Sequence, residues 1–270
     1  METFECNLII IGGAEDKKGK MEILQEVCSK INKEKDELII ATVATEHPQE
    51  VGAEYNNIFK DMNVRNVSIL NVESREDAIR QDNLNLIKNA SLIFFTGGDQ
   101  LRITSILGGT PLYSGLKRKF EEGCIFVGTS AGASVMSDTM IVKGLDEESP
   151  KKCTLKMAPG LGLITGVIID QHFAQRGRIG RLLVGIAENP QSLGVGIDED
   201  TAIVVNNNKE FKVIGSGAVY VVDGSGISHS NVSEQYQDEL LSIFDVKMHV
   251  LKKGNIYNFE VRKPYKDQVR

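Results

Sequence analysis

Short runs made entirely of apolar residues, each followed by a longer helix-patterned stretch, dominate the first half of this chain. Leu8–Ile11 is one such run, and residues 20–33 after it carry apolar side chains at helical spacing. A further helix is expected over 49–62. The alternation continues through the apolar runs 38–43, 67–72, 92–95 and 124–127. Because neither face of these runs is polar, helices must cover both faces of the sheet. The pattern predicts an α/β fold with a doubly wound, mostly parallel sheet.

The second half of the chain carries shorter β-rich runs at closer intervals. These runs are 193–197, 202–205, 212–214 and 218–222. Turn signals at 206–208 and 223–224 separate them, which predicts extra, partly antiparallel strands at one edge of the same sheet. The polar segment 143–160 is expected to be an exposed loop. Since no internal repeat or low-complexity linker interrupts the chain, we expect a single domain over 1–270.

Charge and composition exclude several classes of protein. Lys and Arg number 31 against 37 Asp and Glu, a net charge of −6 with both signs spread along the chain. A general nucleic-acid binder would show a basic excess or a basic face, so that class is not expected. No signal peptide is visible, and no apolar run approaches the ~20 residues that span a bilayer. The sequence predicts a soluble cytoplasmic protein without a membrane partner.

The four cysteines are far apart and form no C-x-x-C pair. Cys6, Cys28 and Cys124 lie in apolar stretches, where reduced, buried thiols are expected, and Cys153 lies in the polar segment. A structural zinc site would need closer pairing of its ligands, so no metal is expected.

Polar clusters follow several of the predicted strands, at the sheet edge where ligands bind in parallel α/β folds. One of them, Gly128-Thr129-Ser130-Ala131-Gly132, fits the G-x-S-x-G pattern of a nucleophile elbow. Its glycines permit a tight strand-to-helix turn that exposes the serine hydroxyl. The alternative is a glycine-rich turn that only links strand to helix. Because an apolar strand precedes the pattern, we predict that Ser130 is a nucleophile.

A nucleophilic serine needs a base, and His172 directly follows the apolar strand 167–171. His47 could lie at the same edge, but Pro48 and polar neighbours favour a loop there. The base also needs an acid to orient it. Asp198, Glu199 and Asp200 follow the strand 195–197, and alternation alone does not choose among them. Asp170, two residues before the histidine, is a rival.

Two further features lie at the same predicted edge. Gly97-Gly98 follows a buried strand, and its backbone N–H groups could form an oxyanion site or a turn capped by Asp99. Three cations just after the histidine suit the recognition of carboxylate or phosphate, although a solvated helix face is the plainer explanation. They are Arg176, Arg178 and Arg181.

Together these motifs resemble the cyanophycinase group of serine exopeptidases in peptidase family S51. The resemblance covers nearly the whole chain and depends on several motifs in the expected order. They are Ile11–Lys17, Thr96–Gln100, Gly128–Ala133, Asp170–Phe173, Gln175–Leu182, Gly196–Ala202 and Leu241–Val246.

The resemblance implies a flavodoxin-like fold related to class I glutamine amidotransferases, with Ser130 in place of their cysteine. It implies Ser130 as nucleophile, His172 as base and Glu199 as the orienting acid. The N–H groups of Gly98 and Ala131 would form the oxyanion hole. The implied substrate-binding residues are Gln100, Asp170, Gln171, Arg176, Arg178 and Arg181.

The implied substrate is cyanophycin, a poly-aspartate whose β-carboxyl groups each carry arginine through an isopeptide bond. The group cleaves the backbone and releases β-Asp-Arg dipeptides without a metal or organic cofactor. Its members are similar to proteins that form homodimers, so a homodimer is implied. An α-aspartyl dipeptidase of the same family is an alternative, although it needs no pocket for an arginine side chain. A non-enzymatic binding protein of the same fold is another, but it would have no need to keep nucleophile, base and acid.

Overall fold

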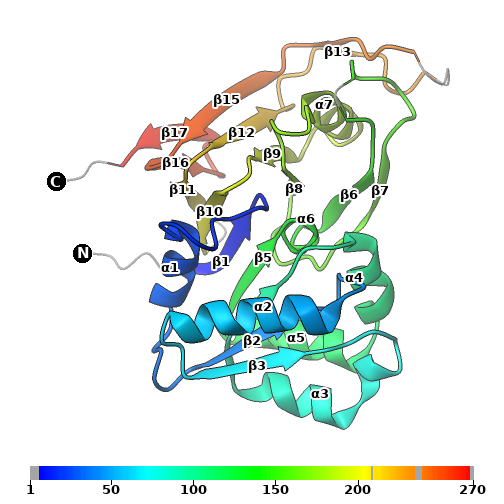
Figure 1. The fold of residues 1–270 in the computed structure, drawn as a ribbon. Coiled ribbons are helices and arrows are strands. Elements are labelled where there is room, and N and C mark those ends of the chain that lie inside the picture. The colour runs from blue at the N-terminus through cyan, green and yellow to red at the C-terminus, as the bar shows by residue number, and fades with distance from the viewer. Residues whose placement is uncertain (1–5, 147, 208, 235–238, 268–270) are drawn as a thin grey trace.

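A nine-stranded sheet forms the centre of the computed structural model, which describes residues 6–146, 148–207, 209–234 and 239–267. Its strand order is β17-β16-β11-β10-β1-β5-β4-β2-β3 (Figure 1). Five neighbouring strands run parallel and confirm the apolar runs read from the first half of the sequence. They are β1 (Cys6–Ile11), β5 (Ile125–Thr129), β4 (Ala90–Phe95), β2 (Glu37–Ala41) and β3 (Asn66–Leu70).

Helices cover both faces of these parallel strands, as predicted. Along β1, Ile9 and Ile11 pack into one apolar core, while Leu8 and Ile10 pack into another on the opposite face. This alternation follows from the side-chain period of two in a strand. The core around Ile9 and Ile11 includes side chains of α1 (Glu22–Ser29) and α2 (Pro48–Asp61). The core around Leu8 and Ile10 includes side chains of α4 (Gln100–Leu107) and α5 (Pro111–Glu121). The short helix α3 (Gln81–Leu86) lies between the 3₁₀ turns η1 (Asp77–Ile79) and η2 (Ile87–Asn89), beside α5.

Antiparallel strands extend the sheet at the β1 edge. β10 pairs with β1, and three more antiparallel strands follow outward. The four strands are β10 (Thr201–Asn206), β11 (Glu210–Gly215), β16 (Asn255–Asn258) and β17 (Lys263–Lys266). They confirm the antiparallel edge predicted for the runs 202–205 and 212–214.

A second, four-stranded sheet contains two runs that the sequence assigned to the first. Its order is β15 (Lys247–Lys252), β12 (Ala218–Asp223), β9 (Leu193–Ile197) and β8 (Val167–Gln171). Leu182 and Ile186 of α7 (Ile179–Glu188) pack on it. The prediction that 193–197 and 218–222 join the nine-stranded sheet was therefore wrong. An apolar run reveals that a strand is buried, but not which strand it pairs with.

The segment 143–160 is only partly the exposed loop that was predicted. β7 (Lys156–Pro159) pairs antiparallel with β6 (Thr139–Lys143), and residue 147 lies outside the described residues. Lys152 is fully buried, with its Nζ 2.7 Å from Oε2 of Glu239 and 3.4 Å from Oε2 of Glu234. Lys152 can be buried because two glutamates from a later segment pair with its charge. The polar character of residues 143–160 alone does not predict this burial.

The remaining short elements are α6 (Ala131–Ser134) and the paired strands β13 (His229–Ser230) and β14 (Ile243–Phe244). None of the helices in the described ranges is long and apolar enough to cross a membrane. Cys28 and Cys124 are free and buried, as predicted, and Cys153 is exposed. Burial raises the pKa of the Cys28 thiol to about 11 and that of Cys124 to about 12. The side chain of Cys6 lies outside the described part of the structure.

Candidate active site

Ser130 stands on a sharp turn between β5 and α6. Its φ of 55° and ψ of −114° are unfavourable for a residue with a Cβ atom and need support from the surrounding structure. The flanking glycines allow the chain to approach itself closely. A Cβ atom on Gly128 would lie 2.1 Å from the Gly132 carbonyl oxygen, and one on Gly132 would lie 2.4 Å from that of Phe95. The turn has the strand-to-helix form expected of a nucleophile elbow.

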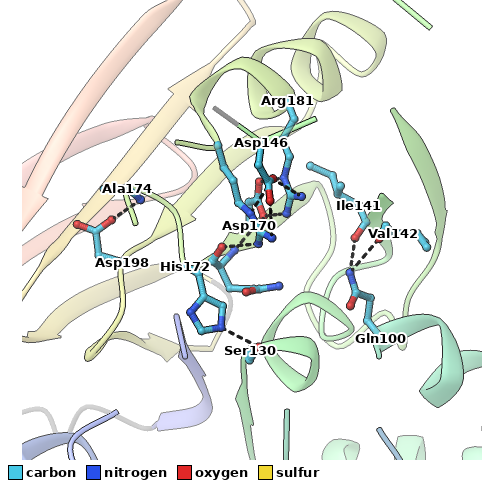
Figure 2. A network of polar contacts seen from close by, with 12 residues as sticks. Gln100, Ser130, Ile141, Val142, Asp146, Asp170, His172, Ala174, Arg181 and Asp198 are labelled. Carbon is cyan, nitrogen blue, oxygen red and sulfur yellow. Dashed lines mark hydrogen bonds and ion pairs between the residues drawn. The ribbon is translucent and has the colours of Figure 1, made fainter. Parts of the chain in front are cut away.

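His172 and Glu199 complete a hydrogen-bonded chain with this serine. The Nε2 atom of His172 lies 3.0 Å from Oγ of Ser130, and its Nδ1 atom lies 2.6 Å from Oε1 of Glu199. Figure 2 shows the imidazole directed toward Ser130. Since a carboxylate only accepts, Nδ1 carries the proton and Nε2 is free to accept one from the serine hydroxyl.

The other acids considered from the sequence have different partners. Asp198 accepts hydrogen bonds from the N–H groups of Ala174 (2.9 Å) and Ala218 (3.1 Å). One oxygen of Asp200 accepts from the backbone N–H of Asp16 at 2.9 Å. These two carboxylates therefore attach the turn after β9 to neighbouring segments of the chain. Glu199, which lies between them in the sequence, contacts the histidine.

The surroundings of His172 favour a neutral imidazole. Burial lowers its pKa below the ordinary value of 6.5, and the positive charges of Arg176 and Arg178 act in the same direction. The hydrogen bond that His172 donates to Glu199 opposes this shift but does not outweigh it. A neutral imidazole beside a serine hydroxyl can act as a general base near neutral pH.

The backbone after β4 and at the start of α6 lies beside Ser130. Ala131 is the first residue of α6, so its N–H has no acceptor within that helix. Gly98 has a φ of 142°, and a Cβ atom there would lie 2.2 Å from the Ala44 carbonyl oxygen. Gly97 beside it is so close that its Cβ would lie 3.3 Å from Cβ of Ser130. The oxyanion role of the Gly98 and Ala131 N–H groups stays a prediction.

Two of the three candidate arginines lie in buried ion pairs. Arg178 and Arg181 are 5% and 7% exposed, whereas Arg176 is exposed to solvent. Nε of Arg181 lies 2.7 Å from Oδ2 of Asp170, and Nη1 of Arg181 lies 3.0 Å from Oδ1 of Asp146. Figure 2 shows both aspartates beside the guanidinium group of Arg181. Of the three, Arg176 alone has the solvated position considered from the sequence, in the turn before α7.

Asp146 is a member of this cluster that the sequence did not single out. Its Oδ1 atom accepts from Nε of Arg178 at 3.1 Å, while Nη1 of Arg178 donates to the Gln171 carbonyl oxygen at 2.7 Å. The only signal for Asp146 was its position in an acidic polar segment, which suggested solvent exposure. Two buried guanidinium groups require about two carboxylates for neutralisation, and Asp170 supplies only one. This charge balance, rather than any local motif, is the signal that points to Asp146.

The two candidate glutamines differ in how their amides are satisfied. Gln100 donates from Nε2 to the Ile141 carbonyl oxygen at 2.8 Å. Gln171 is 5% exposed, and its Oε1 atom has no hydrogen-bond partner within the described part of the chain. A buried acceptor without a partner, next to His172, is suited to bind a donor from a ligand. The remaining histidines lie at the N-terminus of α2 (His47), in β13 (His229) and in β15 (His249).

Several curated proteins are similar to this chain over most of its length. A curated protein of Synechococcus elongatus named "Cyanophycinase" is 38% identical over 252 residues, covering 93% of this chain and 78% of the relative. A second "Cyanophycinase", from Geminocystis herdmanii, is 37% identical over 264 residues and 97% of both chains. A "Peptidase E" of a Nostoc species is 23% identical over 180 residues, 64% of this chain and 69% of the relative.

Solved structures show the same fold. A peptidase from an acI-B1 actinobacterium superposes with a TM-score of 0.66 and 22% identity, covering 93% of this chain and 96% of that one. A putative peptidase E from Listeria monocytogenes superposes with a TM-score of 0.54 and 14% identity, covering 78% and 99%. The model of peptidase family S51 matches residues 8–213. With a peptidase family model over most of its length, close curated relatives and the same fold, the chain belongs to peptidase family S51.

Proposed function

We propose that this protein is a serine exopeptidase that hydrolyses cyanophycin (multi-L-arginyl-poly-L-aspartate) to β-Asp-Arg dipeptides. The hydrogen-bonded chain Ser130–His172–Glu199 is the observation that carries the reaction type. Relatives named "Cyanophycinase" that are 37–38% identical over most of the chain support the substrate.

The reaction is an acyl transfer through Ser130. Its Oγ attacks a backbone carbonyl of the substrate while Nε2 of His172 takes the hydroxyl proton. The N–H groups of Gly98 and Ala131 stabilise the oxyanion, and Glu199 stabilises the imidazolium. His172 then gives the proton to the leaving amine as the C–N bond breaks. A water molecule, deprotonated by the same histidine, hydrolyses the ester and restores the serine.

The side chains around the triad match a substrate that carries both carboxylates and guanidinium groups. The unpartnered Oε1 of Gln171 can accept from the substrate guanidinium. Asp170 is 1% exposed and paired with Arg181, so its part is to hold that arginine in place beside Gln171. Arg176 is exposed and can bind the α-carboxylate at the chain end. Arg178 and Arg181 are buried in ion pairs with Asp146 and Asp170, and Arg178 also binds the Gln171 carbonyl oxygen. Gln100 lies apart from Arg181 (Figure 2). No metal or organic cofactor takes part in this scheme.

Two further properties belong to the proposal. We infer a homodimer and a cytoplasmic location from the resemblance to the cyanophycinase group. Size-exclusion chromatography with light scattering at several protein concentrations tests the first. Fractionation of the producing cells tests the second.

The decisive experiment incubates purified protein with insoluble cyanophycin and a chelator, followed by mass spectrometry of the soluble fraction. We expect β-Asp-Arg with the wild type and a decrease of roughly 10⁴-fold or more in turnover with Ser130→Ala, because this change removes the group that forms the acyl-enzyme. Circular dichroism must show that the variant is folded.

The other results lead to different conclusions. Cleavage of α-aspartyl dipeptides without release from cyanophycin would keep the serine mechanism and replace the substrate. Unchanged turnover by Ser130→Ala, with contamination excluded, would remove the proposed nucleophile.

A further inference from the structure

The turn that follows β1, residues 12–16, is hydrogen-bonded to the backbone that carries the base and the acid. The Gly12 carbonyl oxygen accepts the N–H of His172 at 2.8 Å. The Gly13 carbonyl oxygen accepts the N–H of Asp200, the neighbour of Glu199, at 2.9 Å. These bonds fix the ends of β8 and β9, which belong to the four-stranded sheet, against the first turn of the chain.

The same turn lies directly against the histidine ring. Gly13 has a φ of 98°, and a Cβ atom there would lie 2.4 Å from Cε1 and 2.5 Å from Nε2 of His172. Its position therefore decides where the catalytic nitrogen lies.

On its other side, the turn is tied to the nucleophile strand by one buried carboxylate. Glu15 is 4% exposed, and its Oε2 atom accepts the hydroxyl of Thr129 at 2.6 Å. Thr129 is the last residue of β5 and directly precedes Ser130, whose N–H donates to the Ile11 carbonyl oxygen at 3.1 Å. A buried carboxylate is costly unless hydrogen bonds satisfy it. This bond joins the turn to the strand that carries the nucleophile.

The second oxygen of Glu15 is directed away from the reacting atoms. Its Oε1 atom accepts the hydroxyl of Tyr55 in α2 at 2.5 Å. Burial and the nearby carboxylate raise the pKa of Tyr55 well above its ordinary value, so this hydroxyl remains a donor. The Lys17 ammonium lies 4.2 Å from the centre of the Tyr55 ring. Glu15 thus has one bond toward Ser130 and one toward a helix, which allows the two to be tested separately.

We propose that Glu15 is a positioning residue for catalysis, which through Thr129 holds the turn 12–16 against the nucleophile and so sets the Ser130–His172 distance. It touches no substrate and takes no proton. The inference rests on the proposed serine mechanism.

The test measures the nucleophilicity of Ser130 with phenylmethylsulfonyl fluoride, a small probe that needs no knowledge of the substrate. Thr129→Val removes the hydroxyl at nearly constant volume, and Thr129→Ser keeps it. We expect Thr129→Val to lower the second-order rate constant of Ser130 sulfonylation about 10- to 100-fold, because small misplacements of reacting groups cost that much. Thr129→Ser should react within about threefold of the wild type.

Two matched variants separate positioning from general packing. Tyr55→Phe removes the other hydrogen bond of Glu15 and should lower stability with little change in the sulfonylation rate. Glu15→Gln, which keeps the size of the side chain, should slow the reaction less than Thr129→Val because its amide can still bond a hydroxyl. With cyanophycin, Thr129→Val should lower kcat and leave KM nearly unchanged.

The possible results are distinct. A Thr129→Val protein that is folded and sulfonylated at the wild-type rate would overturn the inference. So would Tyr55→Phe slowing the reaction as much as Thr129→Val, because the effect would then be one of packing. Absence of sulfonylation at Ser130 in the wild type would instead remove the proposed mechanism, and this inference with it.

Discussion

The two sheets contribute to the site by different physical means. The nine-stranded sheet supplies Ser130 from a strained turn at the end of β5, held by close backbone contacts at glycines. The four-stranded sheet supplies His172 and Glu199 after β8 and β9, beside a buried cluster of arginines and aspartates. Close backbone packing therefore positions Ser130, on what we call the nucleophile side of the site. Buried ion pairs lie beside His172, which with Glu199 forms what we call the base side. A substitution should affect activity differently depending on which side it alters.

The contact between the two sides offers the strongest test of this comparison. Gly13→Ala places a methyl group on the His172 ring, and we expect kcat to decrease roughly 10²-fold. Gly123→Ala is the matched control, because Gly123 has a similar φ of 91° but no atom within 4 Å of a Cβ there. Both variants should lose stability from backbone strain, by about 1–2 kcal/mol, measured by urea denaturation.

Only the first variant should lose turnover once the folded fractions are equalised. An equal kcat in the two variants would contradict the view that the first turn positions the histidine.

The base side can be weakened by itself at Asp146. Asp146→Asn leaves Arg178 and Arg181 with one carboxylate instead of two, and we expect KM for cyanophycin to rise about 10-fold as the pocket rearranges. Because Asp146 is partly exposed, the loss in the free energy of unfolding should be about 1–2 kcal/mol, less than for a fully buried pair.

Glu148→Gln in the same segment is the control. Glu148 pairs with Lys151 at the surface, so its loss should cost less than about 0.5 kcal/mol and leave KM unchanged. Equal effects of the two substitutions would show that the Asp146 bonds contribute no more than a surface pair.

The smallest expected effect is a shift in the pH dependence of kcat/KM. Protonated His172 cannot accept the serine proton, so activity falls as pH decreases through the pKa of this histidine. Because burial lowers that pKa, the acidic limb should have its midpoint below 6.5. Arg176→Ala removes a positive charge that lowers the pKa, so the midpoint should move upward.

A pH profile measured with and without this substitution checks both statements. A wild-type midpoint above 6.5, or a downward shift in the variant, would disagree with the environment described for His172.

Burial patterns predicted the parallel half of the fold well, because an uninterrupted apolar run has few alternatives in a chain of this composition. They did not predict the second sheet. β9 and β10 are separated by only three residues, yet β10 pairs with β1 while β9 pairs with β8 and β12. Burial is a property of one strand, whereas pairing depends on two.

The site shows the same limit. Ser130 was identified from the G-x-S-x-G pattern after an apolar strand, and His172 from its place after another such strand, both of which are local features. Alternation could not choose among Asp198, Glu199 and Asp200, and the family resemblance pointed to Glu199, the carboxylate that contacts His172 in the structure. Asp146 escaped notice because its partners, Arg178 and Arg181, are more than 30 residues away. Only folding brings these charges together.

The buried cysteines have a consequence for oxidation. With thiol pKa values of about 11 and 12, Cys28 and Cys124 would be ionised in roughly one molecule in 10⁴ or fewer at neutral pH. Oxidants react with the thiolate form, so these two sulfur atoms are poor targets for peroxide. The proposed nucleophile is an oxygen atom, which does not follow the sulfenic-acid route at all. Among the cysteines whose side chains the structure describes, exposed Cys153 is therefore the one open to oxidants, and it lies outside the candidate site.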